Sequence, residues 1–518
     1  MDILSTKELL AREEAAFATG ITAGALMDAA GLAMFERIVA LYPRAGEFVV
    51  LIGKGNNGGD GLVVARHLAQ GGAQVDVVLT APESELGELP VSRLSRLREM
   101  APRATIKPWS SDIPFPDSRG VVIDALLGVQ ARGALRGNLA EVVAAMNRAR
   151  EKNFFRTVAL DLPSGLSAYE EGAAPKERDA AVIADVTIAV GFAKGVLARE
   201  ALAGWVGRIE VVPWSAEAEN ASRHQVLLGS ELAHLLPRRG ALSFKNTFGK
   251  LTIVAGSRGF TGAPVLCAHG AQGVGTGLLS IITQDDASDV VAATAPPEAM
   301  VSGWTNLDET PEVVKKASAL VVGPGLGTSP ESEHMLRNAL AVDGPVLVDA
   351  DGLNLLAKDL ALLKQAKGPV VLTPHVGEMA RLIGRKFSPD EREDVARDFV
   401  EKHGVTLVLK GTRTLVTAPG KQLFVNTTGN PGLATGGSGD TLSGVIGGLL
   451  AQGLEPLDAA RLGVWLHGHA ADLVLARRET EEGLTPTLLA ETLGAAIASL
   501  RAQAAVRPGL LECAKQGA

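Results

Sequence analysis

The sequence predicts an α/β fold with two domains, each a mostly parallel sheet between two layers of helices. Apolar, β-branched runs of about four to eight residues recur along the chain, as is typical of buried parallel strands. Helical stretches lie between several of these runs, and such alternation indicates a layered α/β architecture. The chain has 518 residues, which is too long for one hydrophobic core and favours more than one domain.

The first domain is expected to span residues 1–215. Two helices are expected within residues 6–42, and further helices at 61–70 and 138–151, where apolar positions recur with helical spacing. The expected strands are residues 47–53, 73–80, 120–128, 156–165, 185–192 and 208–214.

The second domain is expected to span residues 225–510. Residues 214–225 are polar and have no hydrophobic period, so the boundary is placed there. Two helices are expected after Asp440, in an Ala- and Leu-rich stretch without proline before Pro456. The expected strands are residues 250–257, 277–283, 319–327, 345–354, 369–379, 405–416 and 422–429.

Composition narrows the class of protein. The net charge is −8 and no block of Lys or Arg stands out, so nucleic acid is not an expected partner. The first residues are charged and do not resemble a signal peptide. No stretch reaches about 18 apolar residues, so no membrane span is expected. The two cysteines, Cys267 and Cys513, have no metal-type spacing, and a reduced, cytoplasmic setting is expected.

A glycine-rich turn follows the first expected strand. Gly53, Gly55 and Gly58 match the spacing G-x-G-x-x-G, which alone is a weak indication of dinucleotide binding. Asparagines and an acid crowd this turn, where small neutral residues would normally line a pyrophosphate. Phosphate binding therefore stays open, and the polar side chains indicate additional roles.

Two further strand ends carry acids, Asp124 and Asp161, and Ser164 follows the second. Asn57, Asp124 and Ser164 offer only oxygen ligands, which hard cations prefer. Because only one of the three is a carboxylate, a monovalent ion is favoured over a divalent one. The alternative is that these residues cap helices and turns.

The motifs LMDAAG, GNNGGDG, DALLG, LDLPSG and VGFAKGVL together resemble the NAD(P)HX epimerase domain, the YjeF N-terminal family, with its Rossmann-like fold. The resemblance implies K⁺ at Asn57, Asp124 and Ser164, and epimerisation at C6 of the hydrated nicotinamide, with Asp161 as candidate acid/base group. Relatives often have Thr-Gly where this chain has Val129 and Gln130. The implied hydrate-binding residues are Asn56, Asn57, Gly58, Gly59, Asp60, Gly128, Val129, Gln130, Ala131, Arg132, Gly133, Ala134 and Asp161.

A second glycine-rich stretch, GGSGD, ends in a single acid, Asp440, where a loop enters an expected helix. A helix N-terminus presents unpaired N–H groups and partial positive charge, which suits an anion. The alternative is a plain helix entry with Asp440 as a cap. Lys410, Thr412 and Thr414 follow another strand and could meet phosphates or ribose, although no P-loop motif occurs.

The second half resembles the ribokinase-like superfamily, and more closely the ADP- or ATP-dependent NAD(P)HX dehydratases. The motifs are GPGLG, DADGLN, LTPHVGEM, LKGTRT and NPGLATGGSGD. One departure is residues 243–250, where relatives usually have His-Lys-Gly. The resemblance implies that the hydrate meets Ala263, Gly327, His375 and Asp440. It also implies that the nucleotide meets Lys410, Gly411, Thr412, Arg413, Thr414, Gly436, Gly437, Ser438 and Gly439.

The expected function is repair of the hydrates NADHX and NADPHX by a bifunctional enzyme. Asp440 would deprotonate the C6 hydroxyl, which attacks the terminal phosphoryl group of Mg²⁺-bound ADP or ATP, and phosphate would then leave. ADP is the preferred expectation, and a homo-oligomer is expected. Alternatives are a kinase for a small alcohol, such as a hydroxymethylpyrimidine, and a non-catalytic nucleotide sensor.

Overall fold

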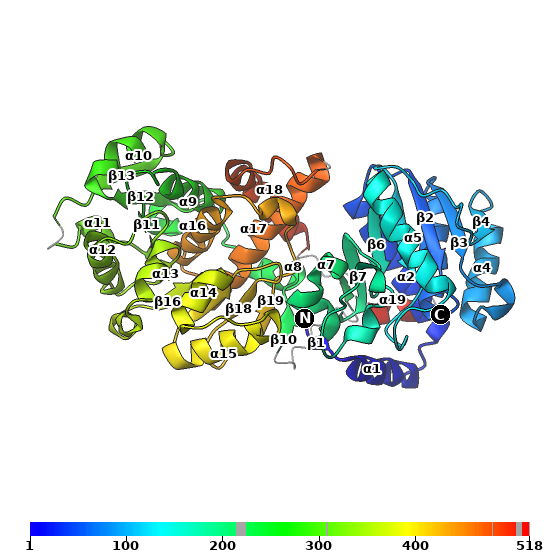
Figure 1. Ribbon diagram of the computed structural model, residues 1–518. Helices are drawn as coiled ribbons and strands as arrows, with labels where there is room; N and C mark the ends of the chain where they lie inside the picture. Colours follow the sequence, from blue (N-terminus) through cyan, green and yellow to red (C-terminus); the bar gives the residue numbers. More distant parts are fainter. Residues whose placement is uncertain (214–223, 307–308, 479, 504–509, 517–518) are drawn as a thin grey trace. The chain divides into compact units, whose positions relative to one another are not determined.

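The computed structural model describes residues 1–213, 224–306, 309–478, 480–503 and 510–516. The chain divides into two compact units, Met1–Ser222 with Val506–Ala518, and Arg223–Ala505. Both are α/β units, as the sequence predicts (Figure 1). The expected boundary, residues 214–225, lies almost entirely outside the described residues. The last residues group with the first unit, whereas the sequence analysis assigns the chain up to residue 510 to the second domain.

The first unit contains a seven-stranded sheet in which every neighbouring pair is parallel. The chain first runs outward from β2 in one direction and then returns to place β5 on the other side of β2. The crevice at the carboxyl ends of β2 and β5 is therefore a topological switch point, where ligands bind in such sheets. The strands, in spatial order, are β4 (Thr105–Pro108), β3 (Gln74–Leu79), β2 (Glu47–Ile52), β5 (Val121–Ala125), β6 (Arg156–Leu160), β7 (Val186–Gly191) and β9 (Arg208–Pro213).

Helices cover both faces of this sheet. Gly61 in α3 packs against Ala125, Ile52 and Val50 on one face, and α2 and α4 flank α3. Apolar residues of α5 form a core with Val49, Leu51 and Val122 on the other face. The short strand β1 (Ile3–Leu4) pairs with β8 (Ala193–Lys194), and α19 packs against α2. The main helices are α1 (Thr6–Ala18), α2 (Ala23–Leu41), α3 (Asn56–Gln70), α4 (Glu88–Met100), α5 (Asn138–Asn153) and α19 (Leu510–Gln516).

The second unit has a ten-stranded sheet that is parallel except where β18 runs antiparallel to β17 and β19. Its switch point lies between β11 and β14. The strands, in spatial order, are β10 (His224–Val226), β19 (Leu423–Val425), β18 (Leu415–Thr417), β17 (Thr406–Leu409), β16 (Val370–Leu372), β15 (Val346–Val348), β14 (Ala319–Val322), β11 (Lys250–Val254), β12 (Leu278–Thr283) and β13 (Ala299–Gly303).

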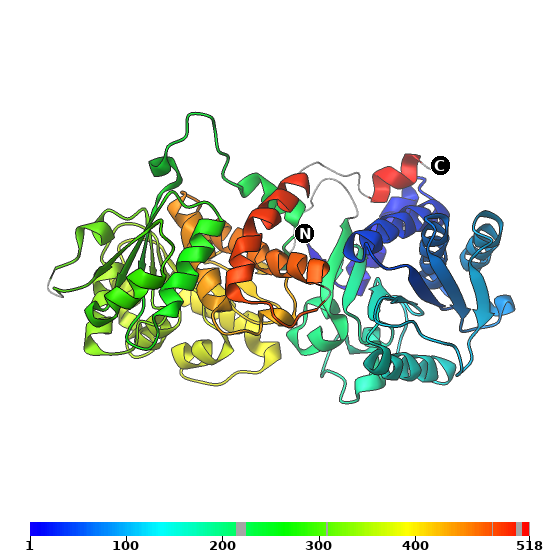
Figure 2. The same ribbon diagram turned by 90° about the horizontal axis from the view of Figure 1, so that it is seen from above.

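Two layers of helices enclose this second sheet (Figures 1 and 2). One layer contains α9 (Gly262–Gly273), α16 (Ser438–Ala451), α17 (Pro456–Arg478) and α18 (Pro486–Gln503). The other contains α12 (Pro330–Leu340), α13 (Asp351–Leu356), α14 (Val376–Ile383) and α15 (Arg392–His403).

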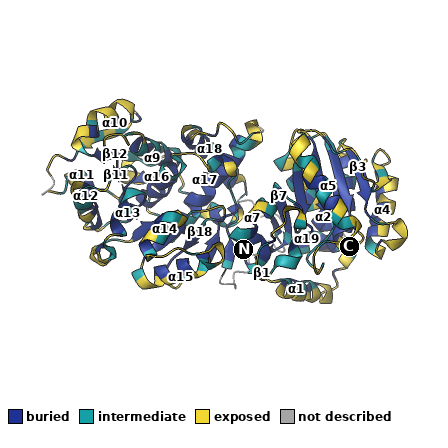
Figure 3. Cartoon of the chain, in the orientation of Figure 1, coloured by how far each residue is buried: buried dark blue, intermediate teal, exposed yellow. Residues whose placement is uncertain are grey.

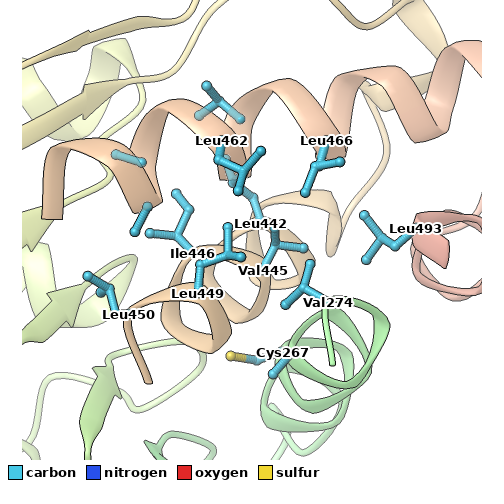
Figure 4. Packing of buried hydrophobic residues seen from close by; sticks show 14 of the residues in the cluster. Cys267, Val274, Leu442, Val445, Ile446, Leu449, Leu450, Leu462, Leu466 and Leu493 are labelled. Carbon is cyan, nitrogen blue, oxygen red and sulfur yellow. The ribbon is translucent and has the colours of Figure 1, made fainter. Parts of the chain in front are cut away.

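Helix α16 lies at the centre of its layer and is buried from Thr441 to Ala451 (Figure 3). Its leucine and isoleucine side chains meet residues of α9, α17 and α18 (Figure 4). Small residues permit this packing: a Cβ on Gly444 would lie 1.8 Å from the carbonyl oxygen of Cys267 in α9. The rigid support holds the first turn of α16, where Asp440 lies.

Within the described residues, no single helix is both long and apolar enough to cross a membrane; only α1 and α2 together, bent by 119°, meet that test of length and composition.

Candidate active sites

In the first unit, the turn after β2 brings the ends of β2 and β5 together. A Cβ on Gly53 would lie 1.8 Å from the carbonyl oxygen of Leu126, and a Cβ on Gly58 would lie 2.0 Å from that of Gly53. These glycines are therefore required for backbone packing. The turn opens α3 at Asn56, so the polar side chains predicted from the sequence lie at the helix start.

Asn57, Asp124 and Ser164 meet around the backbone of Leu127. The Asn57 amide donates to the Leu127 carbonyl at 2.9 Å, and the Leu127 N–H donates to the Ser164 hydroxyl oxygen at 2.9 Å. Ser164 in turn donates from its hydroxyl and its N–H to the two Asp124 oxygens, at 2.7 and 2.8 Å. The three residues that the sequence analysis grouped are thus neighbours in space.

This cluster has unused capacity for a cation. Burial raises the pKa of Asp124 to about 6, although hydrogen bonds from Ser164 and Leu126 oppose the shift. The side-chain oxygen of Asn57 is buried and accepts no hydrogen bond from the described residues. A buried acceptor without a partner is costly, and a cation would satisfy it. Among the described residues, no group of three or more His, Cys, Asp or Glu is arranged to hold a metal.

The predicted loop from Gly128 to Ala134 begins directly beside this cluster. A Cβ on Gly128 would make an ordinary contact, 3.5 Å, with that of Asn57. The loop has no regular structure, and Gln130, Arg132 and Ala134 are exposed. It can therefore offer backbone groups to a ligand beside Asn57.

Asp161 follows β6 and adopts a left-handed conformation with φ of 67°, which is uncommon for a residue other than glycine. Its carboxylate accepts the Val190 N–H at 3.1 Å and forms an ion pair with Lys194. Asp60, at the start of α3, has a raised pKa because of burial and the nearby charges of Asp161 and Glu13. Lys194 and Glu13 were not among the residues predicted for this site. Lys194 nevertheless lies within the motif VGFAKGVL.

In the second unit, GGSGD forms the entry into α16, as predicted. Gly437 precedes the helix with φ of 91°, and a Cβ on it would also lie 2.4 Å from Leu266. Gly436 is exposed, and Ser438 and Gly439 are half-buried. The first N–H groups of α16 therefore lie at an accessible surface, which suits an anion.

Helix α17 forms hydrogen bonds with this loop and with the segment before it. Burial lowers the pKa of His467 to about 4, so its ring is neutral, and its Nε2–H donates to the Ser438 carbonyl at 2.9 Å. Asp472 accepts the Gly429 N–H at 3.0 Å and the Asn430 amide at 3.2 Å. These contacts, which were not predicted from the sequence, fix the backbone that leads into the loop Gly436–Gly439, the anion loop.

Asp440 lies in the first turn of α16 beside a buried charge network. Burial, and then the negative charge of Asp349, raise its pKa to about 7, against the effect of Lys410. Asp349 accepts the Lys410 ammonium at 2.8 Å and the Ser443 hydroxyl at 2.7 Å. Lys410 also lies 3.9 Å from Glu378. A carboxylate with a pKa near neutrality is suited to act as a general base.

The other predicted residues surround this network. His375 caps α14, its Nδ1 accepting the N–H groups of Gly377 and Glu378 at 2.9 and 3.2 Å, yet its side chain is 53% exposed. Gly327 donates its N–H to Asp351 at 2.9 Å. A Cβ on Gly325, two residues before Gly327, would lie 3.1 Å from that of Ala263, so the Gly325–Gly327 turn lies beside the start of α9.

The predicted nucleotide segment follows β17. Lys410 lies beside the anion loop, because a Cβ on Gly439 would be 3.6 Å from its ammonium nitrogen. Gly411 and Thr412 are exposed, whereas Arg413 is 3% exposed. The Thr414 hydroxyl donates to the Gly411 carbonyl at 3.0 Å, which closes the turn.

Comparison with known proteins gives matches along most of the chain. Residues 251–494 match the family model described as NAD(P)H-hydrate dehydratase, and residues 23–196 match that of the YjeF-related protein N-terminus. The bifunctional NAD(P)H-hydrate repair enzyme Nnr of Escherichia coli is 37% identical, over 93% of this chain and 90% of that protein. The protein of the same name from Moorella thermoacetica is 35% identical, over 88% of each chain.

A solved structure is similar to the second unit. It is the ADP/ATP-dependent NAD(P)H-hydrate dehydratase from Bacillus subtilis co-crystallised with ATP and Mg²⁺. It is 30% identical, covers 53% of this chain and 98% of its own, and has a TM-score of 0.47.

Proposed function

The chain belongs to the family of bifunctional NAD(P)H-hydrate repair enzymes, and from this premise we propose which residues carry each activity. It is an epimerase and a dehydratase of hydrated NAD(P)H. The dehydratase model matches the second unit, and the YjeF N-terminal model matches the first. The epimerase site is therefore assigned to the crevice between β2 and β5, and the dehydratase site to the entry into α16.

In the dehydratase, Asp440 removes the proton from the C6 hydroxyl of the hydrate. The observation that carries this assignment is its position in the first turn of α16, beside an accessible glycine loop, with a pKa of about 7. The hydroxyl oxygen attacks the terminal phosphoryl group of the nucleotide and displaces the rest of the nucleotide. The lone pair of the ring nitrogen then expels phosphate from C6, and loss of a proton from C5 forms the C5=C6 double bond of the reduced nicotinamide.

The charge that develops on the phosphoryl group is held by the chain itself. The N–H groups of Gly436, Gly437 and Gly439 lie at the start of α16, where that of Ser438 donates to the Thr435 carbonyl at 3.3 Å, and Lys410 lies beside Gly439. Fixed donors of this kind stabilise the transition state without having to reorganise. Gly411 to Thr414 bind the rest of the nucleotide, and Ala263, Gly327 and His375 form the side that meets the hydrate.

In the epimerase, Asp161 is the acid/base group for inversion at C6. Its strained backbone and its two fixed partners hold the carboxylate in one orientation, and strain of this kind is concentrated at functional sites. Asn56 to Asp60 and the loop from Gly128 to Ala134 bind the hydrate on either side.

The cluster of Asn57, Asp124 and Ser164 fits K⁺. The unpartnered Asn57 oxygen, the single carboxylate and the Leu127 carbonyl supply only oxygen ligands and one charge. The ion would neutralise Asp124 and present a positive charge to the substrate beside the loop from Gly128.

The phosphoryl donor is ADP, bound together with Mg²⁺. The described part of the chain offers no cluster of three or more acidic or imidazole ligands, so the nucleotide phosphates would hold most of the ion, as is usual for Mg²⁺. The ion supplies charge neutralisation on those phosphates.

The test is recovery of nicotinamide absorbance from a mixture of R and S hydrates, with ADP and ATP titrated separately. Complete recovery with ADP supports both activities and the choice of donor. Recovery of only the S half contradicts the epimerase assignment, and better use of ATP contradicts the donor. Formation of a stable phosphorylated product would instead indicate a kinase.

A further inference from the structure

The first unit contains a buried lysine that has no role in the proposed catalytic steps. Lys194 ends β8 and is only 1% exposed. Its ammonium group donates to the Val190 carbonyl at 2.8 Å and forms an ion pair with the Asp161 carboxylate. A buried ammonium is costly unless it is paired, so its side chain is held at Asp161.

Asp161 is fixed by three contacts with β7 and β8, two of them made by its carboxylate. One of its oxygens accepts both the Val190 N–H, at 3.1 Å, and the Lys194 ammonium. The backbone N–H of Asp161 donates to Ile188 at 2.8 Å. Within the described part of the chain no group donates to the second carboxylate oxygen, so it is the atom available to a substrate.

Two further carboxyl groups interact electrostatically with Asp161, namely Asp60 from α3 and Glu13 from α1. The pKa of each is raised, mainly by burial and then by the charge of Asp161. Lys194 opposes both shifts, and Arg93 from α4 opposes that of Asp60. The positive charge of Lys194 therefore acts on all three acids. Among the described acids, Asp161 is the one in direct contact with its ammonium group.

We propose that Lys194 is a positioning residue of the epimerase reaction, whose buried ammonium group fixes the orientation of the Asp161 carboxylate close to the acids Asp60 and Glu13. The inference rests on the proposed role of Asp161. Proton transfer at C6 requires a charged acceptor at a fixed place. Without the ammonium group, the half-buried Asp161 carboxylate would face the two neighbouring acids with no cation in contact with it.

The test compares Lys194→Met with Lys194→Arg in the full chain. Pure R hydrate is supplied without nucleotide, so that the dehydratase is silent, and S hydrate is quantified by chromatography from pH 5 to 9 after subtraction of the uncatalysed rate. Lys107→Met is the matched control, because Lys107 pairs with Asp76 at 3.5 Å but is 49% exposed.

Lys194→Met is expected to lower the epimerase rate about 10²-fold at pH 7, in the range that general acid–base catalysis contributes. Its activity should rise again toward pH 9, because loss of the neighbouring positive charge moves the acid limb of the profile to higher pH. Lys194→Arg should keep the native pH profile with a smaller loss, and Lys107→Met should match the native protein. Dehydration of S hydrate with ADP should be unchanged in all three.

Two results would overturn the inference. One is a native rate and pH profile in Lys194→Met; the other is an equal loss at every pH that arginine does not relieve. If the methionine variant does not fold, a shifted profile in Lys194→Arg would also overturn it. Full activity in Asp161→Asn would instead refute the proposed role of Asp161.

Discussion

Replacing Asp440 by asparagine should stabilise the second unit while it greatly lowers the dehydratase rate. The start of a helix normally favours a carboxylate. At this position, however, burial and the negative charge of Asp349 raise the pKa of Asp440 to about 7, from an ordinary value of 3.8. The ionised side chain is thus held where it is unfavourable, and asparagine removes the charge while it keeps the shape.

The size of the effect follows from the two pKa values. The pKa is higher in the folded state than in the unfolded state, so between them the folded state binds more protons and stability falls as the pH rises. About three pH units at 1.36 kcal/mol each give a penalty of at most ~4 kcal/mol. Solvent at the open glycine loop screens part of it. The penalty grows from about pH 4 to 7 and is constant above pH 7.

The assay is calorimetric unfolding of the native chain and Asp440→Asn at pH 4 and pH 8. Two units can give two transitions, and that of the second unit is identified by its shift when ADP is added to the native chain. Asp440→Asn should raise this transition at pH 8 but not at pH 4, and should lower the dehydratase rate by about 10³-fold. A lower transition temperature at pH 8, or an equal gain at both pH values, would refute the reasoning.

Three further predictions concern catalysis, the cation and packing. The dehydratase kcat/KM should fall about tenfold per pH unit below pH 7, since Asp440 must be ionised; a flat profile from pH 5 to 8 would exclude it as the base. Exchange of K⁺ for tetramethylammonium should lower epimerase activity but not dehydratase activity, and Asn57→Leu should make the epimerase insensitive to this exchange. Equal sensitivity of native and variant chains would refute the ion site. Gly444→Ala should destabilise the second unit by several kcal/mol, because its Cβ would lie 1.8 Å from a carbonyl oxygen. The matched control, Gly494→Ala, meets nothing within 4 Å and should stabilise α18 by about 0.5–1 kcal/mol; no loss of stability for Gly444→Ala in urea unfolding, or a loss as large for Gly494→Ala, would contradict the packing.

The alternation of strands and helices could be predicted because it depends on local hydrophobic period. The residues at which strands end could be predicted less accurately. The expected strand 156–165 ends as β6 at Leu160, because Asp161 takes a left-handed conformation. Likewise the expected strand 120–128 ends as β5 at Ala125. Two residues later, the Leu127 carbonyl accepts a hydrogen bond from the Asn57 amide instead of pairing in the sheet.

Acids at strand ends could be identified as site candidates, since the carboxyl ends of parallel strands meet at one edge. Contacts between segments that lie far apart in the sequence could not be predicted. Lys194 reaches Asp161 from another strand, and His467 reaches Ser438 from the middle of an apolar helix. Neither segment carries a local pattern that predicts its partner. The role of His375 as a helix cap depends in the same way on backbone geometry that sequence does not contain.

Helix α19 gives the first unit a discontinuous sequence. Leu510 and Ala514 are each 2% exposed, and the helix packs on α2, nearly 500 residues earlier in the chain. An epimerase produced from residues 1–213 alone would lack this helix and would present apolar surface of α2 to solvent. A fragment that also carries residues 510–516, as an added peptide or through a new connection, should therefore be more stable than residues 1–213 alone.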